Sequence, residues 1–458
     1  MATQVTSEIT DCIALHFGRS GCGFGEKFWE LACKEHDLSL STGEGKNLFR
    51  NFQSLFSQNE SGLYKARALF IDPDGQDISH LKNGRVKNIT DTDLNFLTDK
   101  EDGFGNFAAG YYINNANMLK ELDPKLRKMV ESCDKTPTFL STVSYSGGSA
   151  GVYCRVMSNI LHDEFTKSTH INFGLFPSPI LGRSSVDSYN FILSQAAEDW
   201  GKNSNFIRVI FDNEALYASS ARHKNTLDLG YEHVNLEVAR VMSLLTSSNR
   251  FNTNPTADLS KMIVKPLLNY ITPSYTRMLG EESDTIEFDT TYPLLMEGGA
   301  LLASCPLDKV LADSVYTRGI APSYSFQEKL EATIKNSENT LFENIHFDPR
   351  AIPVRMTAFD TFELGRLTSN KGVIEMLKRE MKRFDLAHAK RAFVFWFVGQ
   401  GMEEGEFSES REHMEKVYTE YNDGCTLTSS SESDSDDISN NSGDENPQLL
   451  AEVESLEI

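Results

Sequence analysis

Two glycine-rich loops, each between a predicted strand and a predicted helix, constrain the fold of this chain most. The first, GRSGCGFG at 18–25, follows the apolar run Cys12–Phe17, and the second, SYSGGSAG at 144–151, follows Phe139–Ser144. A strand that turns directly into a helix is the repeating unit of an α/β domain with a mostly parallel sheet. The carboxyl ends of parallel strands meet at one edge, so both loops would direct N–H groups and helix dipoles into one crevice. Phosphate is the natural occupant, although a single loop of this kind is more often a tight packing turn.

The alternation of strands and helices extends through the first half of the chain. The candidate strands, each followed by a loop of small or polar residues, are Cys12–Phe17, Ala66–Ile71, Phe139–Ser144, Ile171–Phe176 and Phe206–Phe211. Helical spacing next predicts one long helix that joins two domains, with an apolar face of Val234, Val238, Val241 and Leu245. We expect further strands and helices over 262–380, followed by two C-terminal helices.

Composition and charge limit the environment and the partners of this protein. The 458 residues are 40% hydrophobic, which suits a large core, and no apolar run has the length of a membrane helix. The polar N-terminus does not resemble a signal peptide, so we expect a cytoplasmic protein. Seven scattered cysteines without a CxxC pair predict reduced thiols rather than disulfides or a zinc site. The net charge of −22 disfavours nucleic acid and anionic membranes as partners and favours basic proteins.

The C-terminal part of the chain is strongly acidic. Four glutamates crowd one short predicted helical segment, namely Glu403, Glu404, Glu406 and Glu409. A helix cannot bury so many carboxylates, so they form either a solvated face, the commoner case, or a docking surface for a basic partner. From Gly424 onward the chain has nine acidic residues, no basic residue and many serines, and we expect a disordered tail.

Several of these segments resemble the tubulin family, over about residues 11–423. The first glycine loop is similar to the tubulin sequence GQxGxQxG, and the second to its signature GGGTGSG. Between them, TDKEDGFGNFAAGYY at 98–112 resembles the α-tubulin loop that covers the nucleotide. The segment at 384–411, FDLAHAKRAFVFWFVGQGMEEGEFSESR, resembles the C-terminal domain of α-tubulin, where an acidic helix on the outer microtubule surface receives motor proteins. The resemblance is closer to α-tubulin than to β-tubulin.

This resemblance implies a tubulin-like chain of the α/β class with three domains. Residues 1–250 correspond to a GTP-binding domain with a parallel sheet, which includes the start of the interdomain helix. Residues 251–380 correspond to an intermediate α+β domain and 381–423 to a C-terminal helical domain. The disordered acidic tail then covers 424–458.

The resemblance also implies GTP as the cofactor, with Mg²⁺ beside its phosphates. The residues that it places around the phosphates are Gly18, Arg19, Ser20, Gly105, Asn106, Ser144, Gly147, Gly148, Ser149 and Ala150. Asp72 and Asp74 stand where tubulin carries two acids that help to hold the metal, and their hard oxygens suit Mg²⁺.

The remaining nucleotide contacts would be to the ribose and the base. The resemblance places Asp187 at the ribose, Asn213 and Asn235 at the guanine edge, and Tyr231 on the face of the base. Without the resemblance, Asn213 could be only a helix cap and Tyr231 an ordinary core aromatic.

Departures from the family pattern fall on the phosphate loops. Ser146, Ala150 and Val152 replace glycines of the second loop, and every added side chain there risks a clash or a strained φ angle. Arg19 replaces a glutamine, and its guanidinium could bind phosphate and partly substitute for Mg²⁺, or could fill the pocket. Gly105 replaces a phosphate-contacting asparagine. Weak, altered and absent nucleotide binding all remain open.

Lys261 is the sharpest departure. In α-tubulin this position is a glutamate that helps to activate the water attacking the GTP of the neighbouring β-subunit. A lysine is protonated at neutral pH and cannot deprotonate water, so we expect this catalytic position to be inactive. Asp258 remains three residues earlier and would face the same partner surface. Without the resemblance, Lys261 would be an ordinary exposed lysine.

The sequence thus supports three hypotheses. The favoured one is an α-like subunit that pairs with β-tubulin around a non-hydrolysed GTP in microtubules, including specialised arrays such as cilia. Motor or microtubule-associated proteins would then bind Glu403, Glu404, Glu406, Glu409 and the tail. The alternative is a non-polymerising homologue that sequesters or caps tubulin or binds microtubule-associated proteins, because the segment between Lys261 and Ile345 is shorter than in α-tubulin. Intrinsic GTP hydrolysis on self-association ranks last.

Overall fold

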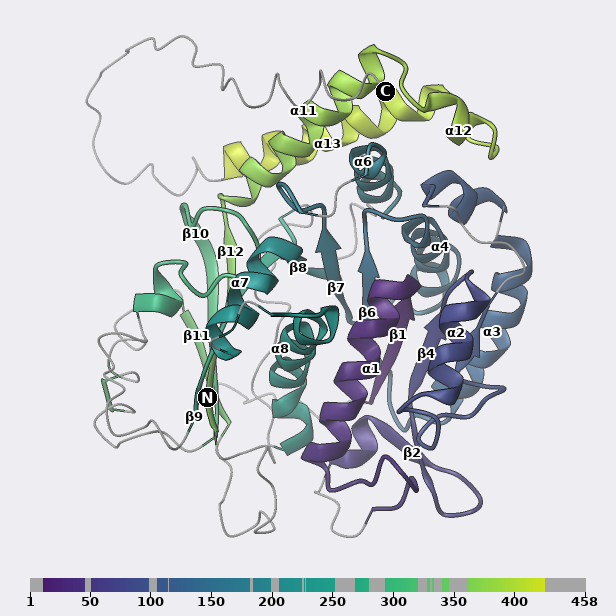
Figure 1. Cartoon of the computed structure of the whole chain (residues 1–458), viewed down its shortest axis with the longest axis vertical. Coiled ribbons are helices and arrows are strands. Elements are labelled where there is room, and N and C mark those ends of the chain that lie inside the picture. Colours follow the sequence, from purple (N-terminus) through teal and green to yellow (C-terminus); the bar gives the residue numbers. More distant parts are fainter. Residues whose placement is uncertain are drawn as a thin grey trace, which may run out of the picture.

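Figure 1 shows the computed structural model of the chain. It describes residues 11–45, 51–98, 105–113, 115–181, 184–198, 206–224, 226, 228–251, 268–279, 293–319, 328–329, 332, 340–345 and 361–424. A ten-stranded sheet with the order β11-β10-β12-β9-β8-β7-β6-β1-β4-β5 runs through this part of the chain. The lysine and aspartate predicted at the partner surface, Lys261 and Asp258, lie outside the described residues, as do 99–104 and the tail from 425 to 458.

The first half of the sheet is parallel throughout. Its strands are β1 (Cys12–Phe17), β4 (Ala68–Ile71), β5 (Phe96–Leu97), β6 (Thr138–Ser144), β7 (His170–Phe176) and β8 (Phe206–Asp212). The predicted α/β class is therefore confirmed. One predicted strand was wrong in detail, because Ala66–Ile71 is divided at Arg67. The residues before Arg67 form β3 (Tyr64–Ala66), which pairs antiparallel with β2 (Phe56–Gln58) rather than joining β4.

Helices cover both faces of this sheet. The side chains of β1 show why, because they alternate between two hydrophobic cores. Ile13, Leu15 and Phe17 belong to one hydrophobic core, whereas Cys12 and Ala14 belong to the other. Successive side chains of a strand point to opposite faces, so an apolar strand of this kind needs a cover on each side. The first core is closed by α3 (Asn115–Glu131), α4 (Ser149–Val156) and α6 (Asp187–Glu198), and the second by α1 (Gly18–Glu35), α2 (Gly75–Asn83) and α7 (Asn213–Lys224).

The second half of the sheet is mixed and begins after a long central helix. That helix, α8 (Tyr231–Phe251), has the apolar face predicted from its spacing. The strands that follow are β9 (Tyr270–Leu279), β10 (Val310–Arg318), β11 (Thr340–Ile345) and β12 (Thr361–Asn370). β9 continues the parallel sheet beside β8, whereas β12 pairs antiparallel with both β9 and β10.

A buried ion cluster links the two halves. Glu35 at the end of α1 forms ion pairs with Arg250 of α8 at 2.6 Å and with Arg318 of β10 at 2.9 Å. Arg318 also pairs with Glu363 of β12. Burial alone would raise the pKa of Glu35, but the two guanidinium groups outweigh it and lower this pKa to about 2. The cluster therefore remains charged and joins α1, α8 and the mixed strands.

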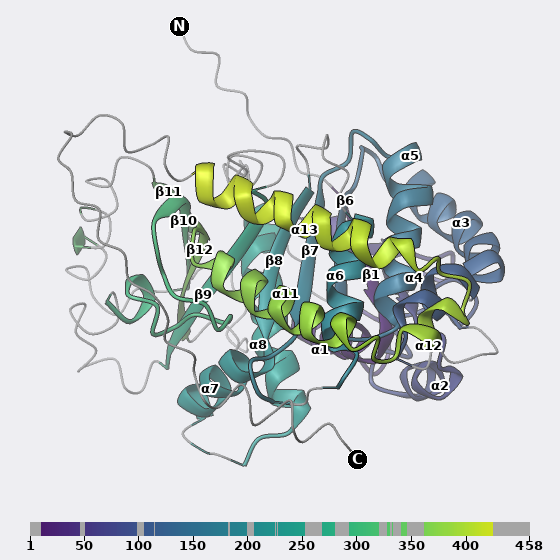
Figure 2. The same cartoon turned by 90° about the horizontal axis from the view of Figure 1, so that it is seen from above.

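Three C-terminal helices complete the fold, namely α11 (Val373–Ala389), α12 (Val394–Val398) and α13 (Gly405–Gly424). Figure 2 shows α11 and α13 side by side over α6, where the Tyr189 ring lies 5.2 Å from Phe384 and 5.1 Å from Phe407. The acidic segment is less regular than predicted, because Glu403 and Glu404 precede α13 and only Glu406 and Glu409 lie in it. Among the described helices, none combines the length and apolarity that a membrane span requires.

Candidate nucleotide-binding site

Both glycine loops lie at the point where the strand order reverses. In the order β5-β4-β1-β6-β7-β8, the chain leaves β1 to form β4 on one side and β6 on the other. Sheets of this kind bind ligands in a crevice beyond the carboxyl ends of the strands at this point. Both predicted phosphate loops therefore lie at the expected ligand position.

The two loops touch each other. Gly18 has a φ angle of +69°, which favours glycine, and a Cβ built on it would lie 2.1 Å from the Oγ of Ser149. A side chain at position 18 would therefore collide with the second loop. The helices α1 and α4 begin at these two residues, and neither Phe17 nor Gly148, the residues before them, provides a side-chain cap. N–H groups at such helix ends and the helix dipoles attract an anion.

The loop predicted to cover the nucleotide is joined to the second glycine loop by Asn190. Its Nδ2 donates to the carbonyl oxygens of Gly105 at 2.7 Å and Ser146 at 2.8 Å, and its Oδ1 accepts from the N–H of Phe107 at 2.9 Å. The sequence reasoning missed Asn190. The available signal was its position, an amide between the apolar side chains of Tyr189 and Phe191 in a predicted helix. Asn190 fixes the relative position of the two loops.

Asn106 connects the covering loop to the C-terminal helices. Its Nδ2 donates to the carbonyl oxygen of Trp396 at 3.0 Å, and its Oδ1 accepts from the N–H of Ala108 at 2.8 Å. The predicted phosphate contact of Asn106 thus competes with a contact to α12. Gly105, beside it, has a φ angle of +68° and no atom within 4 Å of an added Cβ, so it lies next to open space.

The predicted metal ligands lie at the first turn after β4. Asp72 is buried, and its Oδ1 accepts from the N–H of Asp74 at 3.1 Å. Asp74 caps α2, because its Oδ1 accepts from the N–H of Gln76 at 2.8 Å. Within the described residues no group of three or more His, Cys, Asp or Glu side chains could hold a metal ion alone. The two carboxylates fit Mg²⁺ only as partial ligands, since that ion usually completes its shell with phosphate oxygens and water.

Arg19 lies at the surface beside these acids. Its Nε donates to Asp77 at 2.8 Å and its Nη2 donates to the same carboxylate at 3.0 Å, while its side chain is 81% exposed. The hydrogen bond to Asp77 raises the pKa of Arg19. In this arrangement the guanidinium does not fill the space between the glycine loops, and the neighbouring Ser20 continues α1.

The predicted base contacts come from α7 and α8. Tyr231 and Asn235 are four residues apart on α8, and a Cβ added to Gly23 of the first loop would lie 2.6 Å from the Nδ2 of Asn235. The Tyr231 side chain is 68% exposed, so it is not a core aromatic. Asn213 begins α7, and its N–H donates to the Oγ of Ser178 at 3.0 Å.

The predicted ribose contact, Asp187, is buried at the start of α6. Its Oδ2 accepts from the N–H of Ser184 at 2.8 Å, so this carboxylate also holds the turn before the helix. Of the remaining predicted phosphate residues, Ser144 ends β6, Gly147 and Gly148 form the turn, and Ala150 is buried in the first turn of α4.

Exposed apolar side chains border this region. Phe395 is 69% exposed and Trp396 is about half exposed, on the short helix that Asn106 contacts. Ile180 is 72% exposed, and its N–H donates to Glu214, the residue after Asn213, at 2.6 Å. The adjacent exposed rings of Phe395 and Trp396 suit a surface that another molecule covers.

Comparisons with known proteins agree with this geometry. Residues 11–221 match the Tubulin/FtsZ family, GTPase domain. Tubulin alpha-3 chain of Saccharomyces cerevisiae is 27% identical over 438 residues, which cover 90% of this chain and 97% of that protein. Tubulin alpha-2 chain of Emericella nidulans is 26% identical over 431 residues, 89% of this chain and 95% of that protein. The nucleomorph tubulin alpha chain of Guillardia theta is 27% identical, over 90% of this chain and 96% of that protein. The chain is therefore similar to α-tubulins over about nine tenths of its length, and residues 11–221 match the Tubulin/FtsZ GTPase domain.

Proposed function

We propose that this protein is an α-like tubulin subunit that binds GTP at the two glycine loops and pairs with a β-tubulin over the bound nucleotide. The hydrogen bond between Asn106 and Trp396 supports this proposal most directly. It joins the loop beside the phosphate crevice to a helix whose aromatic side chains are exposed. A partner that covers those side chains would also cover the nucleotide, so binding of the two would be coupled.

Each part of GTP has a group that suits it. The N-termini of α1 and α4 would hold the phosphates, and Asp72 and Asp74 would hold Mg²⁺ together with phosphate oxygens. Tyr231 and Asn235 lie on one side of α8, where an exposed ring could stack on guanine and an amide could bind its edge. When bound, Mg²⁺ would neutralise part of the phosphate charge.

We further propose that the heterodimer enters microtubules but does not trigger GTP hydrolysis in the adjoining β-subunit. This part rests on the sequence, because a protonated lysine at position 261 cannot activate water. Microtubules that contain the protein should then retain GTP and turn over slowly. A protein that sequesters or caps tubulin would instead lower the mass of polymer.

The acidic segment before and within α13 is proposed to meet motor or associated proteins. Two of its glutamates are engaged within the chain, since Glu404 pairs with Arg391 at 2.6 Å and Glu406 accepts from the hydroxyl of Tyr112. Glu403 and Glu409 are exposed. Of the four glutamates, we assign these two carboxylates to a basic partner, and we propose that the acidic tail contributes further charge.

Co-purification with β-tubulin, followed by denaturation and chromatography of the released nucleotide, tests the binding proposal. We expect GTP in excess of what the β-subunit carries. Absence of this nucleotide would refute the GTP site, whereas nucleotide without co-purified β-tubulin would refute only the pairing.

Co-polymerisation with measurement of phosphate release tests the second proposal. Lys261→Glu should restore release in the mixed polymer, and Lys329→Glu, a charge change in the same half of the chain, should not. A normal rate of release with the unaltered protein at stoichiometric incorporation would contradict the proposal. Protein that stays in the supernatant while polymer mass falls would favour sequestration.

A further inference from the structure

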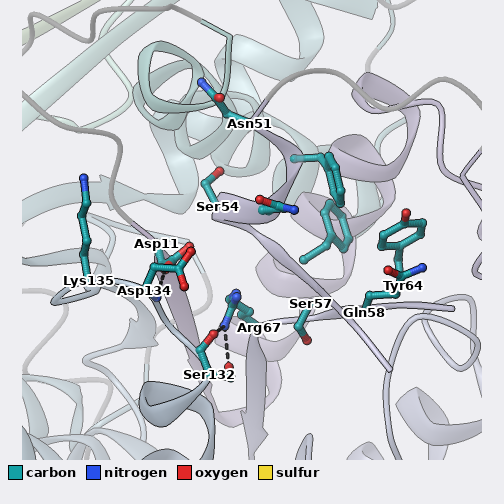
Figure 3. A pocket seen from close by; sticks show the side chains of 13 residues that line it. Asp11, Asn51, Ser54, Ser57, Gln58, Tyr64, Arg67, Ser132, Asp134 and Lys135 are labelled. Carbon is teal, nitrogen blue, oxygen red and sulfur yellow. Dashed lines mark hydrogen bonds between the residues drawn. The ribbon is translucent and has the colours of Figure 1, made fainter. Parts of the chain in front are cut away.

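A polar cavity lies at the amino edge of the sheet, at the opposite end of β1 from the first glycine loop (Figure 3). Its volume is about 490 Å³, and it is lined by Asp11, Asn51, Phe52, Gln53, Ser54, Phe56, Ser57, Gln58, Tyr64, Arg67, Ser132, Asp134 and Lys135. Asp11 directly precedes β1 and Gly18 directly follows it, so a strand of six residues separates the cavity from the nucleotide crevice. That length is on the order of 20 Å. The two sites are distinct.

Arg67 is the central residue of this cavity, and its backbone is fixed on both sides. Its N–H donates to the carbonyl oxygen of Leu55 at 2.9 Å, and its carbonyl oxygen accepts from the N–H of Ala14 at 2.9 Å. The residue stands between β3 and β4, at the point where the chain passes from the small hairpin into the main sheet. Only 7% of Arg67 is exposed, so its charge is held away from bulk water.

The guanidinium of Arg67 is only partly satisfied. One terminal nitrogen, Nη1, donates to the carbonyl oxygen of Ser132 at 3.1 Å, to its Oγ at 2.5 Å and to the Sγ of Cys133 at 3.4 Å. The Nε is buried without a hydrogen bond, and in the described part of the chain no carboxylate forms an ion pair with this residue. Arginine does not lose its proton in proteins, so a buried guanidinium needs an anion.

The walls of the cavity indicate what else a ligand would contact. Phe52 and Tyr64 form an edge-to-face pair with ring centroids 5.1 Å apart, and Figure 3 shows Tyr64 and Gln58 on one side of Arg67. The buried Oγ of Ser54 makes no hydrogen bond within the described residues. An aromatic wall beside a buried cation suits a compact ligand with an anionic group and a planar apolar body.

Two carboxylates limit the charge that the cavity accepts. Asp11 and Asp134 lie on the other side of Arg67 in Figure 3, and the N–H of Asp134 donates to the Oδ2 of Asp11 at 2.9 Å. Lys135 also lines the cavity, but its amine points away from Arg67. The acids would repel a phosphate dianion more than a carboxylate with one charge.

We propose that this cavity binds a small aromatic monocarboxylate, with the acid group on Arg67 and the ring against Phe52 and Tyr64. A carboxylate that accepts from the guanidinium would neutralise a buried charge that no carboxylate of the described residues pairs with. The volume suits such a ligand, since small-molecule pockets span roughly 300 to 1,000 Å³.

Fluorine NMR of the full-length protein with 4-fluorophenylacetate tests this proposal. The probes for comparison are 4-fluorophenylacetamide, which has the same shape without charge, and 4-fluorophenyl phosphate. We expect the acid to bind about tenfold more tightly than either. Equal binding of the acid and the amide, or no binding of the acid at millimolar concentrations, would overturn the proposal.

Three variants locate the binding. Arg67→Met should weaken the acid about tenfold, while Arg85→Met, an exposed arginine outside the cavity, should leave its affinity unchanged. Ser57→Phe should block the cavity and prevent binding of the acid without altering the charge. It tests the site if Arg67→Met does not fold. Unchanged affinity in a folded Arg67→Met or Ser57→Phe protein would place the ligand elsewhere and refute the site.

Discussion

The two edges of the same sheet are built from different chemistry. At the carboxyl edge, backbone groups and glycines face the crevice, and a Cβ at Gly18 would lie 2.1 Å from Ser149. At the amino edge, charged side chains are buried, with Glu35 between Arg250 and Arg318. The glycine loops offer backbone N–H groups to a ligand, whereas the ion cluster holds the two halves of the chain together. Substitutions in the glycine loops and in the ion cluster should therefore differ in kind, with loss of ligand at the first and loss of fold at the second.

The largest effect on stability is expected from Glu35→Gln at the amino edge. This change leaves two buried guanidinium groups without their shared carboxylate, and breaking a buried pair in this way costs about 3–5 kcal/mol. Chemical denaturation measures the loss of free energy of unfolding. As a control, Glu60→Gln in the exposed turn between β2 and β3 should change it little. A loss as small as that of the control would show that the cluster does not hold the edge.

The stability difference between wild type and Glu35→Gln should also depend on pH. The pKa of Glu35 is lowered to about 2 in the folded protein, from an ordinary value of 4.5. A depressed carboxyl pKa adds stability above the unfolded value, and this stability is lost as the pH falls through the folded value. The difference between wild type and Glu35→Gln should therefore be full above pH 4.5 and shrink toward pH 2. A difference that does not change with pH in acid would contradict the assigned ion pairs.

Asn190→Ala should lower the stability by an intermediate amount, and it should also weaken nucleotide binding at the carboxyl edge. The change leaves the buried N–H of Phe107 without its acceptor, and the less buried carbonyl oxygens of Gly105 and Ser146 without their donor. The unpaired buried N–H costs about 1–3 kcal/mol. We expect lower thermal stability and weaker binding of guanine nucleotide, measured with a fluorescent GTP analogue. Ser194→Ala is the matched control, because the Ser194 hydroxyl on the same helix donates to the Phe191 carbonyl oxygen rather than to a glycine loop.

Gly18→Ala distinguishes an effect on nucleotide binding from an effect on stability more clearly than Asn190→Ala does. Its φ angle and the contact with Ser149 both penalise a side chain, by about 1–3 kcal/mol in total. Gly62→Ala is the matched control, since Gly62 also has a positive φ angle but only a distant side-chain neighbour. We expect both variants to lose some stability and only Gly18→Ala to lose nucleotide. Equal nucleotide content in the two proteins would remove Gly18 from the site.

The smallest effect on stability is expected from Arg19→Gln, which restores the residue of the family pattern. The ion pair with Asp77 is exposed on the arginine side, and such pairs contribute about 0–1 kcal/mol. Calorimetry should show little change in melting temperature. If Arg19 contacts phosphate when GTP is bound, the nucleotide affinity should fall nonetheless, and an unchanged affinity would assign Arg19 to the surface alone.

The strands of the parallel half could be predicted because local pattern alone specifies them. An apolar run bounded by glycine, as in Cys12–Phe17, needs no distant contact to be recognised. The division at Arg67 could not be predicted, since it depends on the Leu55 carbonyl oxygen and on Ser132, far along the chain. Asn190 was missed for the same reason, because its partners come from two loops that lie before it in the sequence.

The sequence by itself determined the fold class, the succession of strands and helices along the first half of the chain, and the two glycine loops. These features depend on short-range periodicity and on residues without side chains. Tertiary structure alone decided which residues meet. It placed Ser149 against Gly18, tied Asn106 to Trp396 and gathered Glu35, Arg250 and Arg318 in one buried cluster. Such contacts join residues that are distant in sequence, and burial then sets their charge and strength, which local pattern does not encode.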